Sequence, residues 1–288
     1  MSLDRFFIIA SVRRATMGSM NTTPDTYTHG HHESVLRSHT SRTAENSAGY
    51  LLPYLGEGMA LLDVGCGPGT ITLDLAELVA PGEVVAIDAV SSVLEQADAL
   101  RRRKGIDNCS FQPGDVYHLG FEDGRFDVVH AHQLLQHLSD PVGALREMHR
   151  VLKPNGVLAA RDADYSSMTW APDEPLLDRW LELYHQVTDR NGAEADAGRY
   201  LLGWAQQAGF TAITASSSTW TFATPSRRAW WGSVWAERVL HSSLATQAID
   251  YELSDQAELE AISDAWERWA AHDDGFFAVV HGEIIASK

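Results

Sequence analysis

The sequence has few cysteines, few positive charges and no long apolar run. Only Cys66 and Cys109 occur among 288 residues, so neither a disulfide framework nor a zinc ribbon can be built. Lysine and arginine number 22 against 39 aspartates and glutamates, a formal net charge of −17. Nucleic-acid binding and docking on anionic lipid both favour a basic surface, so this charge argues against both. No apolar run approaches the roughly 20 residues of a membrane-spanning helix. We therefore expect a cytoplasmic protein without membrane insertion.

Tryptophan is absent from the first 169 residues, whereas nine tryptophans lie between residues 170 and 288. This distribution predicts two regions with different tasks. Residues 1–26 are rich in Ser, Thr and Met and lack a signal segment, so we expect a flexible leader there. Residues 27–54 are expected to form an N-terminal helical cap, with a helix over 31–52 that stops at Pro53.

Strands and helices are expected to alternate between residues 60 and 161. Short apolar runs that lead into glycine or aspartate are typical of buried parallel strands. We expect such strands at 60–64, 83–87, 109–112, 126–131 and 157–161. Helical patterns separate them, which predicts an α/β fold with a parallel sheet and helices on both faces.

The first expected strand leads into a glycine-rich loop at residues 63–70, with the sequence DVGCGPGT. Glycines at alternate positions let a ligand approach the backbone and permit a tight turn into the next helix. Such a loop also occurs in dinucleotide-binding folds, but here Thr70 takes the last position of G-x-G-x-x-G. Asp63 precedes the loop, and Asp88 and Asp115 end the next two strands. Doubly wound sheets bind ligands at these carboxyl ends.

With these motifs, the sequence resembles the class I S-adenosylmethionine (SAM)-dependent methyltransferases. It is most similar to the branch that includes the ubiquinone/menaquinone-biosynthesis methyltransferases. The resemblance covers about residues 55–165, through the segments 61–70, 85–88, 114–116, 126–129 and 150–156. It implies a Rossmann-like, seven-stranded, mostly parallel sheet with helices on both faces. Residues 55–288 would form this domain, with its last strands at 210–222 and 276–286. A helical lid over the acceptor, from residues 166–206 and 223–272, would be inserted near these C-terminal strands.

The resemblance also implies how residues of this chain hold SAM. Gly65 and Gly67 would line the methionine moiety, with Cys66 between them as a small packing residue. Asp88 would accept both ribose hydroxyls, a task that suits a carboxylate. The other implied contacts are the adenine amino group for Asp115, the two faces of the adenine ring for Ala89 and Val116, the methionine ammonium for Asp63, and a backbone carbonyl from Ala131.

A histidine-rich segment precedes the first expected helix. In the resembling family, an aromatic or polar residue here closes over the cofactor. Tyr27 would then face the sulfonium through a cation–π contact, and His31 would hydrogen-bond the amino-acid end. A disordered tail and a chance metal-binding run of histidines are the alternatives.

The catalytic candidates follow the fourth expected strand. Methyl transfer needs a base only when the acceptor atom carries a proton in a poorly ionised form. We select His132 and His137, with His137 acting as the base or as the residue that orients the acceptor. His130 is expected to be a buried strand residue. A metal pair of His130 and His132 would depart from the metal-dependent methyltransferases, and no metal is expected.

The predicted function is transfer of a methyl group from SAM to a small, apolar or aromatic acceptor. The tryptophan-rich region favours a quinone, polyketide, sterol or other metabolite of that kind. A nicotinamide-dependent oxidoreductase and a non-catalytic SAM-binding protein are the alternatives. Protein or tRNA methylation is disfavoured by the charge and by the lack of an added recognition domain. The expected partner is the small acceptor, nucleic acid is not expected, and a homodimer is left open.

Overall fold

Seven strands form one sheet, in the order β3-β2-β1-β4-β5-β7-β6. The structure, a computed structural model, describes residues 25–30 and 33–288. The strands are β1 (Leu61–Val64), β2 (Val84–Asp88), β3 (Cys109–Pro113), β4 (Phe126–His132), β5 (Leu152–Ala171), β6 (Ala212–Phe222) and β7 (Phe276–Ser287). Strands β1 to β5 are mutually parallel, whereas β7 runs antiparallel to both β5 and β6. The seven-stranded, mostly parallel sheet predicted from the sequence is confirmed.

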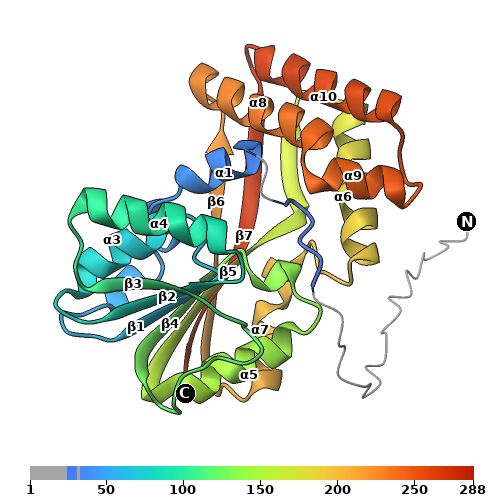
Figure 1. Cartoon of the computed structure of the whole chain (residues 1–288). Coiled ribbons are helices and arrows are strands. Elements are labelled where there is room, and N and C mark those ends of the chain that lie inside the picture. The colour runs from blue at the N-terminus through green and yellow to red at the C-terminus, as the bar shows by residue number, and fades with distance from the viewer. Residues whose placement is uncertain (1–24, 31–32) are drawn as a thin grey trace, which may run out of the picture.

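Helices cover both faces of this sheet. They are α3 (Thr70–Val79), α4 (Ser91–Lys104), α5 (Pro141–Val151) and α7 (Ala197–Ala208). Helices α3 and α4 lie on one face, and α5 and α7 lie on the other (Figure 1). Adjacent residues of β1 show why both faces need cover: Leu61 packs into a core with Leu73 of α3, and Leu62 packs into a core with Leu145 of α5. Successive strand side chains point to opposite faces, and here both faces are apolar.

A third core includes the last part of β5 and the first part of β7. Its helices are α6 (Pro175–Arg190), α8 (Pro225–His241), α9 (Ser243–Asp250) and α10 (Gln256–Ala271). Figure 1 shows α8 and α10 at the end of the molecule opposite α5. Trp180, Trp235 and Trp266 are fully buried here, and the Trp180 ring centroid lies 4.5 Å from that of Trp235 and 4.9 Å from that of Trp266. The edge-on geometry of these pairs suits aromatic packing. Most of the tryptophan surplus therefore builds this core.

The N-terminal helix differs from the prediction. In place of one helix over 31–52, the chain forms α1 (Glu33–Thr40), α2 (Ala44–Ser47) and the 3-10 helix η1 (Leu52–Tyr54). The break has a local cause at Thr43, whose side chain accepts the Asn46 backbone N–H at 3.2 Å. The Asn46 side chain accepts the Thr43 N–H at 3.0 Å in return. This capping box starts a new helix at Ala44, after α1 has ended at Thr40.

The expected lid segments also divide differently. Strand β5 continues to Ala171, ten residues past its expected end at Arg161, because β7 pairs with it as far as Phe276. Helix α7 packs on the sheet through Leu201 and Ala205. Residues 1–24 of the expected leader lie outside the described residues. In the part of the chain that is described, no helix is both long enough and apolar enough to span a membrane.

Candidate active site

The loop between β1 and α3 turns through Gly65, Gly67 and Gly69, at φ values of 74°, 52° and 76°. A side chain is disfavoured at such angles. A Cβ on Gly69 would also lie 2.8 Å from Phe111, and one on Gly65 would lie 2.9 Å from Leu134. Gly67 differs, because the nearest atom to a Cβ there would be His39 Nδ1 at 3.9 Å. Space for a ligand therefore lies over Gly67, whereas Gly65 and Gly69 permit close packing of the protein itself.

Asp88, at the end of β2, braces this loop. Its carboxylate accepts the N–H of Gly67 at 3.0 Å through one oxygen and the N–H of Val90 at 3.0 Å through the other. A carboxylate oxygen accepts more than one hydrogen bond, so Asp88 keeps capacity for two ribose hydroxyls. Ala89 beside it is exposed.

Asp115 and Val116 follow β3 at the same edge of the sheet as Asp88. The Asp115 side chain is 57% exposed and accepts the Tyr117 N–H at 2.9 Å. Val116 is half-buried against the sheet core. This carboxyl-end arrangement has the hydrogen-bond acceptors that a nucleoside requires, so the residues present fit SAM.

Two other expected cofactor residues, Asp63 and Ala131, are built into the core. Asp63 is 3% exposed, accepts the Thr72 hydroxyl at 2.5 Å and lies 2.7 Å from His130 Nδ1. His130 is completely buried, as predicted for a strand residue. Ala131 is completely buried too. The contact of Asp63 with the methionine ammonium stays a prediction, because this carboxylate is buried between Thr72 and His130.

Cys66 is half-buried within the loop. Burial, together with the nearby Asp63 carboxylate, raises the pKa of its thiol well above the usual value. The thiol is therefore protonated at neutral pH and unsuited to nucleophilic attack. This agrees with its expected role in packing.

A cavity of about 710 Å³ lies close to this loop, since its lining includes His39, whose Nδ1 would be 3.9 Å from a Cβ on Gly67. Its aromatic wall comes from elements far apart in sequence and includes Tyr27, Tyr50, Tyr165, Trp220, Phe222 and Trp235. The cavity also contains the side chains of Arg42, His137 and Arg238. Hence the face that α8 turns toward the sheet is part of the candidate site.

His137, in the 3-10 helix η2 (Leu135–His137), lines the cavity. The Tyr27 ring meets it edge-on at 4.7 Å between centroids. Gln136 fixes its tautomer: the Gln136 Oε1 accepts the Ala163 N–H at 3.2 Å, so the amide nitrogen is the atom 3.0 Å from His137 Nε2. That amide donates to Nε2, which places the proton of a neutral ring on Nδ1.

The charge state of His137 follows from its surroundings. Burial, with the positive charges of Arg42 and Arg238, lowers the pKa of the imidazole to about 3. The ring is neutral at physiological pH, and its buried Nδ1 has no hydrogen-bond partner among the described residues. His137 thus offers an N–H donor at the cavity and is a weak base.

His29 is a cavity residue that the sequence analysis did not select. Its Nε2 lies 3.0 Å from the Tyr184 hydroxyl and 3.3 Å from the Tyr165 hydroxyl. It belongs to the histidine-rich segment of residues 27–32, in which the family resemblance implied roles only for Tyr27 and His31. His31 lies outside the described residues. The histidine run was the available signal.

His132 is not brought to the cavity with His137. It is 6% exposed and packs beside the rings of Trp220 and His281, at 5.9 and 6.4 Å between centroids. Burial and the charges of Arg42 and Arg161 lower the pKa of its imidazole well below the usual value. Its proposed catalytic role stays a prediction without geometric support.

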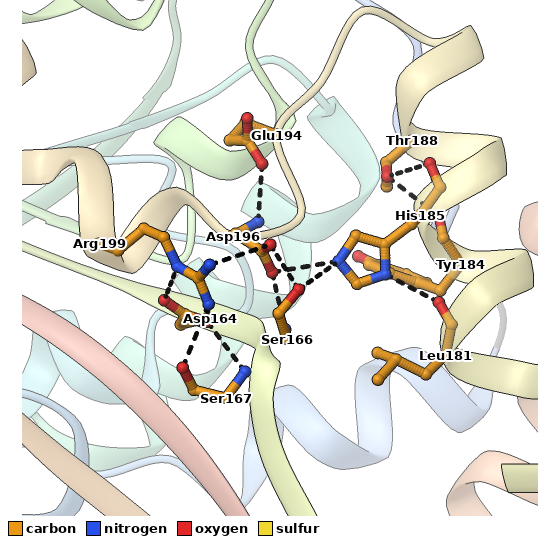
Figure 2. Close-up of polar contacts among 10 residues, drawn as sticks. All are labelled: Asp164, Ser166, Ser167, Leu181, Tyr184, His185, Thr188, Glu194, Asp196 and Arg199. Atoms are coloured by element: carbon orange, nitrogen blue, oxygen red, sulfur yellow. Dashed lines mark hydrogen bonds and ion pairs between the residues drawn. The ribbon is translucent and has the colours of Figure 1, made fainter. Parts of the chain in front are cut away.

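A second polar cluster lies at the far end of β5 (Figure 2). Ser166 Oγ is 3.1 Å from His185 Nε2, as in a nucleophile–base pair. However, Asp196 accepts the Ser166 hydroxyl at 2.6 Å and lies 3.1 Å from the same Nε2, while His185 Nδ1 bonds the Leu181 carbonyl at 2.8 Å. In a catalytic triad the acid bonds the other ring nitrogen. The cluster therefore joins β5 to α6 and α7 and is structural.

A metal site needs several ligand side chains close together, and residues 25–30 and 33–288 contain no such group. No three His, Cys, Asp or Glu side chains there lie close enough together to hold a metal ion.

Comparison with known proteins decides the family. A model of the methyltransferase domain matches residues 55–216. An uncharacterised methyltransferase of Schizosaccharomyces pombe is 37% identical over 270 residues, which cover 91% of this chain and 96% of that protein. The chain belongs to the methyltransferase family. The resemblance predicted from the motifs is confirmed, and the family assignment replaces the oxidoreductase alternative.

Two further relatives of this methyltransferase show where the similarity lies. A demethylmenaquinone methyltransferase of Lactococcus lactis is 35% identical over 128 residues, covering 44% of this chain and 48% of that protein. The crystal structure of YcgJ from Bacillus subtilis aligns with a TM-score of 0.51 at 21% identity, across 90% of this chain and 99% of that chain. The second match shows the shared fold.

Proposed function

We propose that this methyltransferase transfers a methyl group from SAM to a small acceptor with an apolar or aromatic body. The observation that carries the proposal is the aromatic-walled cavity of about 710 Å³ beside the glycine loop. Its volume lies within the range of roughly 300–1,000 Å³ for small-molecule sites. Tryptophan and tyrosine walls favour flat or apolar ligands over peptides and nucleic acid.

The proposed cofactor site lies at the carboxyl ends of the first three strands. Bound SAM supplies a methyl group activated by a sulfonium sulfur. Gly67 leaves room for the methionine moiety, Asp88 accepts the ribose hydroxyls, and Asp115 accepts from the adenine amino group. Ala89 and Val116 flank the ring. Burial raises the pKa of Tyr27 to about 12. Its phenol is therefore neutral, and its ring would face the sulfonium in a cation–π contact.

The residues around the acceptor position it more than they deprotonate it. In-line displacement at a methyl group depends on holding the acceptor atom in the correct orientation and on excluding water. The neutral His137 ring donates a hydrogen bond from Nδ1 to the acceptor, which favours the orienting role over that of a base. An acceptor atom that is already ionised or carries no proton suits this site best.

Binding of S-adenosylhomocysteine (SAH), measured by calorimetry, tests the cofactor site. Asp88→Asn removes the charge that strengthens hydrogen bonds to the ribose, each worth about 1.5–3 kcal/mol. We expect at least about tenfold weaker SAH binding. Asp107→Asn makes the same change at an exposed position before β3, and should leave the affinity unchanged. Equal affinities in wild type and Asp88→Asn would refute the assigned site.

Radiolabelled SAM and a panel of aromatic and apolar metabolites test the acceptor class. The proposal expects label transfer to at least one small molecule. Transfer only to peptides or tRNA would contradict it. Tight SAH binding without transfer to any acceptor would favour the non-catalytic alternative.

A further inference from the structure

Arg238 of α8 is a buried cation in the wall of the cavity. It is 4% exposed, and its guanidinium lies over the Trp235 ring at 4.5 Å from the centroid. One terminal nitrogen donates to Ser38 Oγ at 2.8 Å. Its Nε is buried and has no hydrogen-bond partner in the described part of the chain. Arg238 thus has donor capacity that the protein does not use.

Arg42, between α1 and α2, lines the same cavity. It donates to the Gln133 side-chain oxygen at 2.6 Å, and its buried Nε also has no partner among the residues described. Burial lowers the pKa of the His137 imidazole, and the charges of both arginines lower it further. The same two charges oppose the rise that burial causes in the pKa of the Tyr27 phenol. Their positive charges therefore act on the same region of the cavity.

The carboxylates of the cavity do not neutralise these two cations. Within residues 25–30 and 33–288, no carboxylate forms an ion pair with Arg42 or Arg238. Glu283 lies 3.1 Å from Arg161 and accepts the Ser218 hydroxyl at 2.5 Å. Glu45 is exposed on α2.

The Arg238 guanidinium is buried, and Arg42 is half-buried with a buried Nε. Such cations are costly for a fold when they have no anionic partner. A charge is stable inside a protein when an opposite charge and hydrogen bonds compensate it. Arginine binds planar oxyanions through two parallel N–H donors, and carboxylates are the common partners. A chain with 39 acidic residues against 22 basic ones nevertheless places these two cations at an aromatic cavity. The missing anion is therefore expected to come from a ligand.

We propose that the acceptor is an organic acid, with its carboxylate held by Arg238 and Arg42 and its apolar or aromatic body against the tryptophan wall. This inference rests on the proposed function and specifies its substrate class. The methionine carboxylate of SAM is the other source of such a group. Since SAH carries that same carboxylate, binding of SAH and binding of an acid in the presence of SAH separate the two sources.

The experiment uses two probes of matched shape, naphthalene-2-carboxylate and naphthalene-2-carboxamide. Their affinities are measured by calorimetry on the full chain at saturating SAH. We expect wild type to bind the carboxylate about tenfold more tightly, because charge-assisted hydrogen bonds replace neutral ones. Arg238→Gln should remove most of this preference while leaving the affinity for the carboxamide and for SAH within about twofold.

Arg42→Gln is the second variant, so the test does not depend on one buried substitution. Arg103→Gln, at an exposed position of α4, makes the same chemical change away from the cavity and should behave as wild type. Thermal unfolding of each variant identifies any variant that misfolds. The preference of wild type for the carboxylate over the carboxamide does not depend on the variants, so it tests the proposal even if one of them misfolds.

Three results would count against these proposals, and each one identifies whether the acid-binding subsite or the proposed function fails. Equal wild-type affinity for the two probes would refute the acid-binding subsite alone. SAH binding weakened by both variants, with the preference for the acid intact, would assign the arginines to the methionine carboxylate and overturn the inference. Wild type that fails to bind SAH would overturn the proposed function itself.

Discussion

The role of His137 gives a quantitative test of the mechanism. His137→Phe keeps a ring in place but removes the Nδ1 donor, whereas His137→Asn retains an N–H donor near that position and removes the basic nitrogen. A neutral hydrogen bond contributes about 0.5–1.5 kcal/mol, which corresponds to a fall of roughly two- to twelvefold in kcat/KM. Loss of a general base costs about 10²- to 10⁴-fold. The two roles therefore predict different magnitudes.

We expect His137→Phe to lower kcat/KM within the smaller range and His137→Asn to recover most of the activity. The assay is transfer of labelled methyl from SAM to the best acceptor of the panel. His272→Phe and His272→Asn, at an exposed histidine after α10, are the matched controls. Because the pKa of His137 is lowered to about 3, its ionisation should be absent from the pH–rate profile near neutrality. A hundredfold loss in both variants, together with loss of a neutral-pH inflection present in wild type, would refute the orienting role.

Two stability predictions concern the parts of the molecule around the site. Trp266 is fully buried, so Trp266→Ala should lower the free energy of unfolding by about 3–5 kcal/mol in urea titrations; a loss under about 1 kcal/mol would contradict the assigned core. Burial opposes the charge on His185, but its hydrogen bonds to Asp196 and the Leu181 carbonyl raise its pKa overall. The stability that the protonated His185 adds is fully present below the imidazole's unfolded pKa of about 6.5. It is lost as pH rises through the folded pKa. The wild-type stability advantage over His185→Gln should therefore shrink on raising the pH from about 6, and a pH-independent difference would count against the ion pair.

The sequence predicted the cofactor half because its determinants are local. The strand, glycine loop and helix of residues 61–79 are contiguous, and left-handed glycines define the turn wherever this segment is placed. Asp88 is the last residue of β2 and Asp115 comes two residues after β3, so parallel pairing alone brings them to one edge. The break in the N-terminal helix does not follow from the sequence pattern, because the capping box at Thr43 has Asn46 in place of the usual Glu or Gln.

The acceptor cavity was decided by tertiary structure. His29, His137 and Arg238 are separated by more than a hundred residues at each step, and no spacing rule joins them. In the sequence, Arg238 occurs in an ordinary amphipathic helix and is typical of a solvated position. It becomes a buried, unneutralised cation only because α8 packs between α10 and α1, where Arg238 donates to Ser38. The sequence by itself thus determined the family and the methyl donor's expected site, whereas the burial of charge, which depends on contacts across the whole chain, decided what the acceptor site can bind.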